Sequence, residues 1–172
     1  MRLIIIFLIA LFMVGLSYAD EIDDLIPHII QVESGGNPNA ISKDGCIGLM
    51  QISRTALAEY NYHVYKGPLW GDTCSPHSHV YGCVHVDWTG IETITHDDQD
   101  LFIPDINIKI GEWYLRRLKD HYLKNNYTIE RMLCAWNGGI TRLRQVNYDC
   151  SKMPKESRNF SRKVIILYEK SM

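Results

Sequence analysis

The chain has 172 residues, with 18 basic and 20 acidic side chains and a formal net charge of −2 when histidines are neutral. This balance provides neither the basic footprint of a nucleic-acid-binding protein nor a polybasic patch for an anionic membrane. The length suits one domain with a sizeable core and is short for two.

The N-terminus has the layout of a secretory leader. Arg2 precedes an apolar run from Leu3 to Leu16, and the small residue Ala19 closes the segment. The run is short for a membrane span. We therefore predict a signal peptide over residues 1–19, cleaved after Ala19, and an exported domain over residues 20–172, periplasmic or secreted. An uncleaved anchor is the alternative.

The first predicted helix of the exported part ends on a carboxylate. Its apolar face follows the i, i+3, i+4 spacing and comprises Ile22, Leu25, Ile26, Ile29 and Ile30. Glu33 takes the next position on this face, so its carboxyl group should point inward. Burial and the negative end of the helix dipole both disfavour its charged form, which should raise its pKa towards the range suited to proton donation. The alternative is a solvated glutamate at a helix end.

A glycine-rich turn and a second helix follow. The segment Gly35-Gly36-Asn37-Pro38 predicts the end of the first helix. The second helix is expected from about Ile47 to Tyr60. Its predicted buried face comprises Leu49, Ile52, Ala56 and Leu57.

The segment from about residue 62 to 100 lacks sustained periodicity, and we interpret it as a loop-rich insertion. The alternation over His79–Val86 predicts a short strand or β-hairpin. Four side chains have types that can bind zinc: Cys74, His77, His79 and Cys83. We prefer a Cys74–Cys83 disulfide and no metal, because an exported protein favours oxidation and the spacing fits no common zinc module.

Three further helices are expected. The first begins after Pro104, ends near Asn125-Asn126 and carries an apolar side made of Ile106, Ile110, Trp113, Tyr114, Leu118 and Tyr122. Thr128 can cap the next helix, which ends at Gly138-Gly139. The last begins near Glu156 and should bury Phe160, Val164, Ile165 and Tyr168. The pattern predicts a mainly α protein.

Five cysteines lie in the predicted exported part, at positions 46, 74, 83, 134 and 150. The odd count leaves one thiol unpaired, and the residues alone leave the pairing open. Proximity along the chain favours Cys74 with Cys83 and Cys134 with Cys150. Cys46 would then be a small, buried, free thiol.

Four sequence blocks, taken in order, carry a family resemblance. They are Glu33-Ser34 with Ser42, Gly45 and Gly48-Leu49-Met50-Gln51; Asp105–Leu118; Ala135-Trp136-Asn137-Gly138-Gly139; and Glu156–Phe160 with Lys163-Val164 and Tyr168. Together they resemble the soluble lytic transglycosylase family of lysozyme-like peptidoglycan enzymes. The resemblance implies a lysozyme-like single domain, interrupted here by the insertion.

The resemblance also implies a reaction with one catalytic residue. Glu33 would protonate the glycosidic oxygen between N-acetylmuramic acid and N-acetylglucosamine, and then deprotonate the muramic 6-hydroxyl, which closes a 1,6-anhydro ring without a metal or organic cofactor. A hydrolytic, goose-type lysozyme with Asp44 as second carboxylate is one alternative. An aspartate between Lys43 and Gly45 is more typical of a solvated turn. A non-catalytic wall-binding protein is the other alternative.

Further side chains at or near the family's site positions suit a sugar ligand, with ordinary packing as the alternative. Ser42, Gln51 and Asn137 offer hydroxyl and amide groups, and Met50 offers a thioether for a ring face. Trp136 replaces the family's usual tyrosine. The indole can still stack against a sugar, but a phenolic hydrogen bond to Glu33 is lost, and Tyr114 is the candidate to supply a hydroxyl instead. We expect a monomer acting on peptidoglycan strands, alone or with a cell-envelope assembly or secretion complex.

Overall fold

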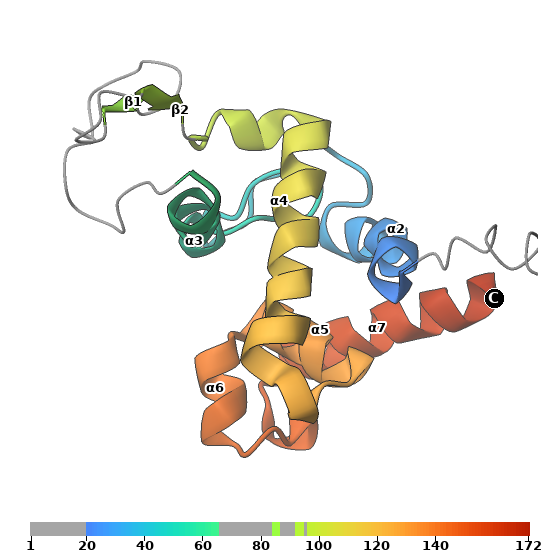
Figure 1. The fold of residues 1–172 in the computed structure, drawn as a ribbon. Helices are drawn as coiled ribbons and strands as arrows, with labels where there is room; N and C mark the ends of the chain where they lie inside the picture. The colour runs from blue at the N-terminus through green and yellow to red at the C-terminus, as the bar shows by residue number, and fades with distance from the viewer. Residues whose placement is uncertain (1–19, 66–83, 87–91, 95) are drawn as a thin grey trace, which may run out of the picture.

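The computed structural model describes residues 20–65, 84–86, 92–94 and 96–172, most of them helical (Figure 1). The mainly α prediction is confirmed. The predicted leader over residues 1–19 lies outside the described residues, as do Cys74, His77, His79 and Cys83. No described helix is both long enough and apolar enough to span a membrane.

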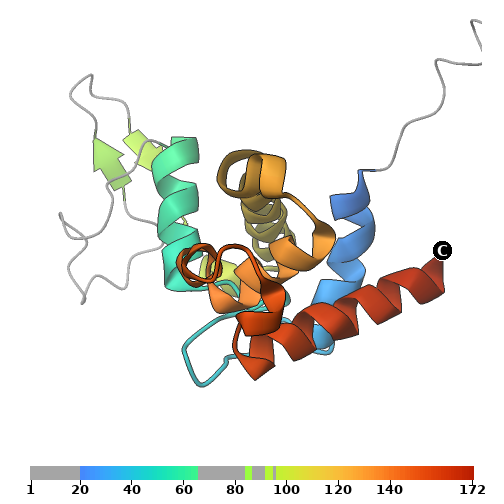
Figure 2. The same cartoon turned by 90° about the horizontal axis from the view of Figure 1, so that it is seen from below.

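A helical column forms the centre of the molecule. The helix α4 (Pro104–Arg117) continues as a π-helical turn, η3 (Leu118–Leu123), and a 3₁₀ turn, η4 (Lys124–Asn126). These bounds agree with the predicted long helix. Figures 1 and 2 place α2 (Glu21–Glu33) and α3 (Arg54–Tyr65) on either side of α4, and both pack against it.

The remaining helices pack below this column in Figure 1. The helix α5 (Ile129–Gly138) contacts α6 (Ile140–Gln145) and α7 (Lys155–Ser171), and α7 also packs against α2. The Thr128 hydroxyl accepts a hydrogen bond from the Arg131 backbone N–H at 3.1 Å, so the predicted cap of α5 is confirmed. The sequence did not predict α6, because a six-residue helix is too short to carry a periodicity signal.

The second predicted helix begins later than expected. The helix α3 starts at Arg54, whereas Ile47 forms isolated antiparallel bridges with Ile41 and Ile52. Gly48 has a φ of 81° and Gln51 a φ of 51°, and this left-handed conformation interrupts a right-handed helix. The predicted buried face otherwise holds for Ile52, Ala56 and Leu57, whereas Leu49 is only partly buried.

The described parts of the insertion contain a short pair of strands. The strand β1 (Val84–Val86) pairs antiparallel with β2 (Glu92–Ile94), and Val84 lies opposite Ile94. β1 therefore falls at the end of the alternating stretch. A 3₁₀ turn, η2 (Asp100–Phe102), then leads into α4.

The predicted Cys134–Cys150 bridge is absent, because both residues are free thiols. Both are buried, and a hydrogen bond joins the two side chains. The fold thus brings this pair together, where α5 meets the 3₁₀ turn η5 (Cys150–Lys152), without a covalent bond. Cys46 is a free thiol as predicted and is partly buried.

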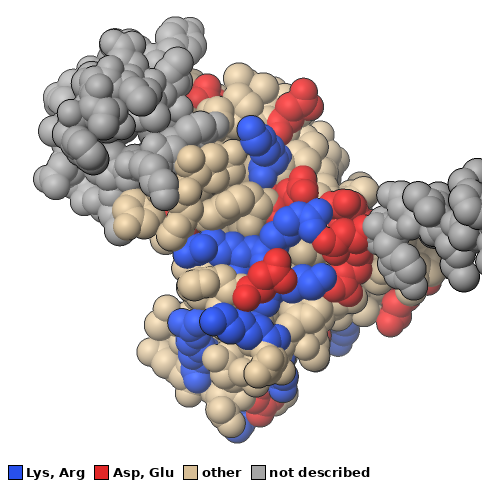
Figure 3. Space-filling model, in the orientation of Figure 1, with Lys and Arg blue, Asp and Glu red and all other residues tan. Residues whose placement is uncertain are grey.

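Ion pairs hold the start of α2 against the central column. Arg116 pairs with Asp20 and, at 2.8 Å, with Asp23, while Lys119 pairs with Glu21 at 2.8 Å. Figure 3 shows basic and acidic side chains side by side in this band of the surface. The network fixes the N-terminal end of the helix whose C-terminal residue is Glu33.

Candidate active site

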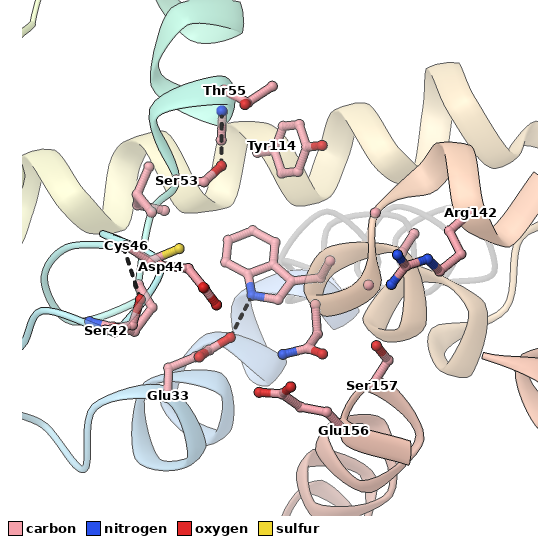
Figure 4. Close-up of a pocket in the computed structure, with 18 of the residues that line it drawn as sticks. Glu33, Ser42, Asp44, Cys46, Ser53, Thr55, Tyr114, Arg142, Glu156 and Ser157 are labelled. Carbon is pink, nitrogen blue, oxygen red and sulfur yellow. Dashed lines mark hydrogen bonds between the residues drawn. The ribbon is translucent and has the colours of Figure 1, made fainter. Parts of the chain in front are cut away.

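A cleft of about 540 Å³ opens among the helices. Its lining comes from the C-terminal end of α2, the segment from Ser42 to Ala56, one face of α4, the end of α5, α6 and the start of α7 (Figure 4). The segments that carried the family resemblance thus meet around one cavity.

Glu33 lies in the wall of this cleft and is partly buried. The indole N–H of Trp136 donates a hydrogen bond to its carboxylate oxygen at 2.9 Å (Figure 4). Burial raises the pKa of Glu33 to about 7, the hydrogen bond from Trp136 opposes this rise, and the negative charge of Glu156 adds to it. A carboxyl group with this pKa is well suited to give a proton and take one back at neutral pH.

The local structure explains why Glu33 is fixed at the cleft. Ile22, Leu25 and Ile29 on its helix face are fully buried, which sets the rotation of α2. The Ser34 hydroxyl donates to the Ile30 carbonyl at 3.2 Å and accepts from the Gly36 N–H at 3.2 Å, which closes the helix.

Asn107 holds the loop from Ile47 to Met50, which leads into the cleft-lining residues Gln51 and Ile52, and its role was not predicted. This fully buried side chain accepts a hydrogen bond from the Met50 N–H at 2.8 Å. Its amide nitrogen donates to the carbonyls of Ile47 at 2.9 Å and Leu101 at 2.8 Å. Gly48 lies so close to Asn107 that a Cβ there would stand 2.2 Å from the amide nitrogen. A lone asparagine in an amphipathic helix gives no sequence signal for such a contact.

Most of the predicted substrate-binding residues share this cleft. Its lining includes Ser42, Gln51, Tyr114, Trp136 and Asn137. The Ser42 hydroxyl accepts a hydrogen bond from the Cys46 N–H at 3.0 Å. The Gln51 amide nitrogen donates to the carbonyls of Ala40 and Gly48, at 3.1 and 2.9 Å.

Met50 departs from its predicted position. Its side chain is fully buried and is absent from the described lining of the cleft. A Cβ at Gly111 would stand 2.4 Å from the Met50 sulfur, so the thioether fills a tight space against α4. The thioether therefore shapes the loop beneath the cleft, and the sequence prediction of a sugar contact is not matched by its location.

The hydrogen bond to Glu33 comes from Trp136 and not from Tyr114. The two rings are neighbours, with centroids 5.8 Å apart. Burial, and after it the charge of Glu59, raise the pKa of Tyr114 to about 12, so its hydroxyl stays neutral in the cleft wall. Trp136 itself therefore supplies the hydrogen bond to Glu33 that we expected from Tyr114.

Two further carboxylates line the same cleft. Asp44 lies in the exposed turn after Ser42, and Glu156 lies in the first turn of α7. Glu156 was not among the predicted site residues, although it opens the last block of the resemblance. Among the described residues, no group of three or more His, Cys, Asp or Glu side chains could hold a metal ion.

The helical fold and a cleft with one desolvated carboxyl group define the lysozyme-like class of protein. The Transglycosylase SLT domain family matches residues 18–72 and 84–158, and the chain belongs to this family. An inactive mutant of lytic transglycosylase Slt from Pseudomonas aeruginosa has a similar fold, with a TM-score of 0.57 and 21% identity. The 70 kDa soluble lytic transglycosylase from Escherichia coli has a TM-score of 0.55 and 22% identity.

These similarities cover most of this chain and a small part of the solved structures. They include 87% and 83% of this chain but only 22% and 20% of the Pseudomonas aeruginosa and Escherichia coli chains. The chain therefore spans about a fifth of the length of those two proteins, and the likeness concerns the fold of one domain.

Proposed function

We propose that the protein is a peptidoglycan lytic transglycosylase with Glu33 as its acid and base. The observation that carries the proposal is the Glu33 carboxyl group, whose pKa is about 7 and which faces a cleft beside Trp136. Membership of the transglycosylase family supports the same reaction.

In the first step, protonated Glu33 gives its proton to the glycosidic oxygen. The bond between that oxygen and the anomeric carbon of N-acetylmuramic acid breaks, and N-acetylglucosamine leaves with a free 4-hydroxyl. The muramic acetamide oxygen stabilises the cationic carbon. Glu33 is now a carboxylate, and the Trp136 N–H at 2.9 Å stabilises its charge.

In the second step, Glu33 takes the proton of the muramic 6-hydroxyl. The 6-oxygen attacks the anomeric carbon and closes the 1,6-anhydro ring. The proton that Glu33 gave is thereby restored and no water is consumed. One residue whose pKa lies near neutrality serves both steps, so no second carboxylate and no cofactor are needed.

The neighbouring side chains suit the binding of N-acetylated sugars. Asn137 follows Trp136 at the end of α5 and presents its amide to the cleft. The amide nitrogen of Gln51 is already engaged by its own loop, which leaves the amide oxygen for an acetamide N–H. The Ser42 hydroxyl can donate to a sugar oxygen while it accepts from Cys46.

Asp44 is the reason to test a hydrolytic lysozyme as the rival function, because it lines the same cleft as Glu33. Mass spectrometry of the muropeptides released from isolated peptidoglycan separates the two. The proposal predicts anhydro products, one water lighter than reducing ends, from the wild type and from Asp44→Asn, and none from Glu33→Gln. Reducing-end products that disappear in Asp44→Asn would overturn it.

The setting of the activity is also part of the proposal. Wall strands lie outside the cytoplasm, so the enzyme would be exported through the leader at residues 1–19 and act as a monomer. A role in wall remodelling or with a cell-envelope assembly or secretion complex stays a prediction.

A further inference from the structure

The charges that line the cleft are unevenly distributed. Among its described lining residues three are acidic, Glu33, Asp44 and Glu156, and one is basic, Arg142. Figure 4 shows the Arg142 guanidinium pointing into the cleft from α6, across the cavity from Asp44 and Glu33.

The Arg142 side chain has no partner of its own among the described residues. In the part of the chain that the structure describes, no hydrogen bond or ion pair engages its guanidinium. By contrast, Arg116 pairs with Asp20 and Glu112, and Arg144, two residues further along α6, donates to the Tyr122 carbonyl at 3.2 Å. The Arg142 guanidinium keeps all its donors for a ligand.

The backbone fixes Arg142 relative to the reaction centre. Gly139, with a φ of 85°, reverses the chain directly after α5, so α6 begins within four residues of Trp136. The next residue, Leu143, is fully buried and anchors α6. A cation is thus held at one end of the cleft that contains Glu33.

We propose that Arg142 binds a carboxylate on the 3-O-lactyl substituent of the muramic acid residue in the cleft. This inference rests on the proposed function, because it takes a peptidoglycan strand as the ligand. The sugar backbone of such a strand is uncharged. Its anionic groups are the lactyl carboxylate where the peptide stem has been removed, or the carboxylates of the stem where it is present.

The charge pattern then sets the direction in which a strand binds. A substrate carboxylate is attracted to the fork of donors on Arg142 and repelled by Asp44 at the other end. Because the lactyl group marks every muramic residue and no N-acetylglucosamine residue, Arg142 would place muramic acid at a defined position in the cleft.

The test measures binding without catalysis, using the Glu33→Gln variant as the parent. Equilibrium dissociation constants are measured for three ligands: un-cross-linked strands that bear peptides, amidase-treated strands with free lactyl carboxylates, and the same treated strands after methyl esterification. Arg142→Gln removes the charge. Arg158→Gln is the matched control, because Arg158 is exposed on α7 and absent from the described lining.

We expect Arg142→Gln to weaken binding about tenfold for a charged ligand and to leave the esterified strands unchanged, with a smaller loss at high salt. A loss confined to the treated strands identifies the lactyl carboxylate as the partner, and a loss confined to peptide-bearing strands identifies the stem. Arg142→Lys should retain part of the affinity.

Equal affinities for Arg142→Gln and its parent on both charged ligands would overturn the inference. So would an equal loss on esterified strands, an equal loss in Arg158→Gln, or no binding by the parent. The proposed function is decided separately, by the anhydro products of the wild type, so the failure of one is distinguishable from the failure of the other.

Discussion

Asn107 and Glu33 are both polar side chains withdrawn from solvent, but Asn107 holds a loop beside the cleft and Glu33 lines the cleft itself. Asn107 is fully buried, and three backbone groups satisfy its amide. Among the described residues, only Trp136 donates a hydrogen bond to Glu33, and burial raises the pKa of Glu33 to about 7. A buried polar group with all its hydrogen bonds made stabilises the fold. A buried carboxyl group with few hydrogen bonds has a shifted pKa, which a proton-transfer reaction can use.

The largest effect should come from removing the acid. We expect Glu33→Gln to reduce the rate of anhydro-muropeptide release by about 10³-fold or more, because no other group then carries the proton in either step. Glu130→Gln, on an exposed turn of α5 outside the described lining, is the control and should keep full activity. A Glu33→Gln variant with wild-type rates would contradict the assignment.

Removing the Asn107 side chain should lower the stability of the fold. Asn107→Ala leaves two carbonyls and one N–H without their buried partner, and we expect a loss of about 3 kcal/mol in the free energy of unfolding. Urea denaturation measures it. Asn125→Ala, at an exposed position, should change stability by less than about 0.5 kcal/mol. Equal losses in the two variants would show that Asn107 does not hold the loop.

Two glycines, Gly48 and Gly45, test how tightly the loop packs against Asn107. Gly48 and Gly45 have similar φ values, 81° and 77°, but an added Cβ meets the Asn107 amide only at Gly48 and nothing within 4 Å at Gly45. Both alanine variants carry the backbone strain, about 1 kcal/mol. We expect Gly48→Ala to be less stable than Gly45→Ala by about 2 kcal/mol further in urea denaturation. Equal stabilities would mean that Asn107 and its loop move to accept the added Cβ at Gly48 without a loss of stability.

The raised pKa of Glu33 should make its effect on stability depend on pH. Well below pH 4.5 the side chain is protonated in both the folded and unfolded states, so its ionisation does not change the free energy of unfolding. As the pH rises from 4.5 to about 7, the unfolded state loses the proton first, so folding becomes less favourable. Glu33→Gln should therefore match the wild type near pH 4 and be more stable at pH 8 by about 1 to 2 kcal/mol. Equal stability at pH 8 would argue against the shift.

The smallest effect concerns the donor to the acid. Trp136→Phe removes the N–H that stabilises the Glu33 carboxylate, so the pKa of Glu33 should rise further and the alkaline limb of kcat/KM should move to higher pH. We expect the rate at pH 6 to fall about fivefold. Trp113→Phe is the control, because that ring packs on Tyr60 at 5.3 Å and lies outside the described lining. An unchanged pH profile in Trp136→Phe would remove Trp136 from the mechanism.

The predictable parts of the molecule were those encoded by local patterns. Periodicity and caps predicted α2, α4, α5 and α7, and the apolar stripe of α2 predicted an inward Glu33. The loop from Ile47 to Ile52 was mispredicted as helix because its shape depends on Asn107, a residue 57 positions beyond Met50. The Trp136 contact with Glu33 spans 103 positions, and Arg142 reaches the cleft only through the turn at Gly139. Such long-range contacts leave no local pattern.

The most direct test of the account is the titration of Glu33 itself. Carbon-13 NMR of the side-chain carboxyl groups, with Glu33→Gln used to assign the resonance, measures its pKa in the folded protein. We predict a midpoint of about 7 for Glu33. A midpoint near the ordinary value of 4.5 would contradict it, because an ionised Glu33 could not deliver the first proton at neutral pH.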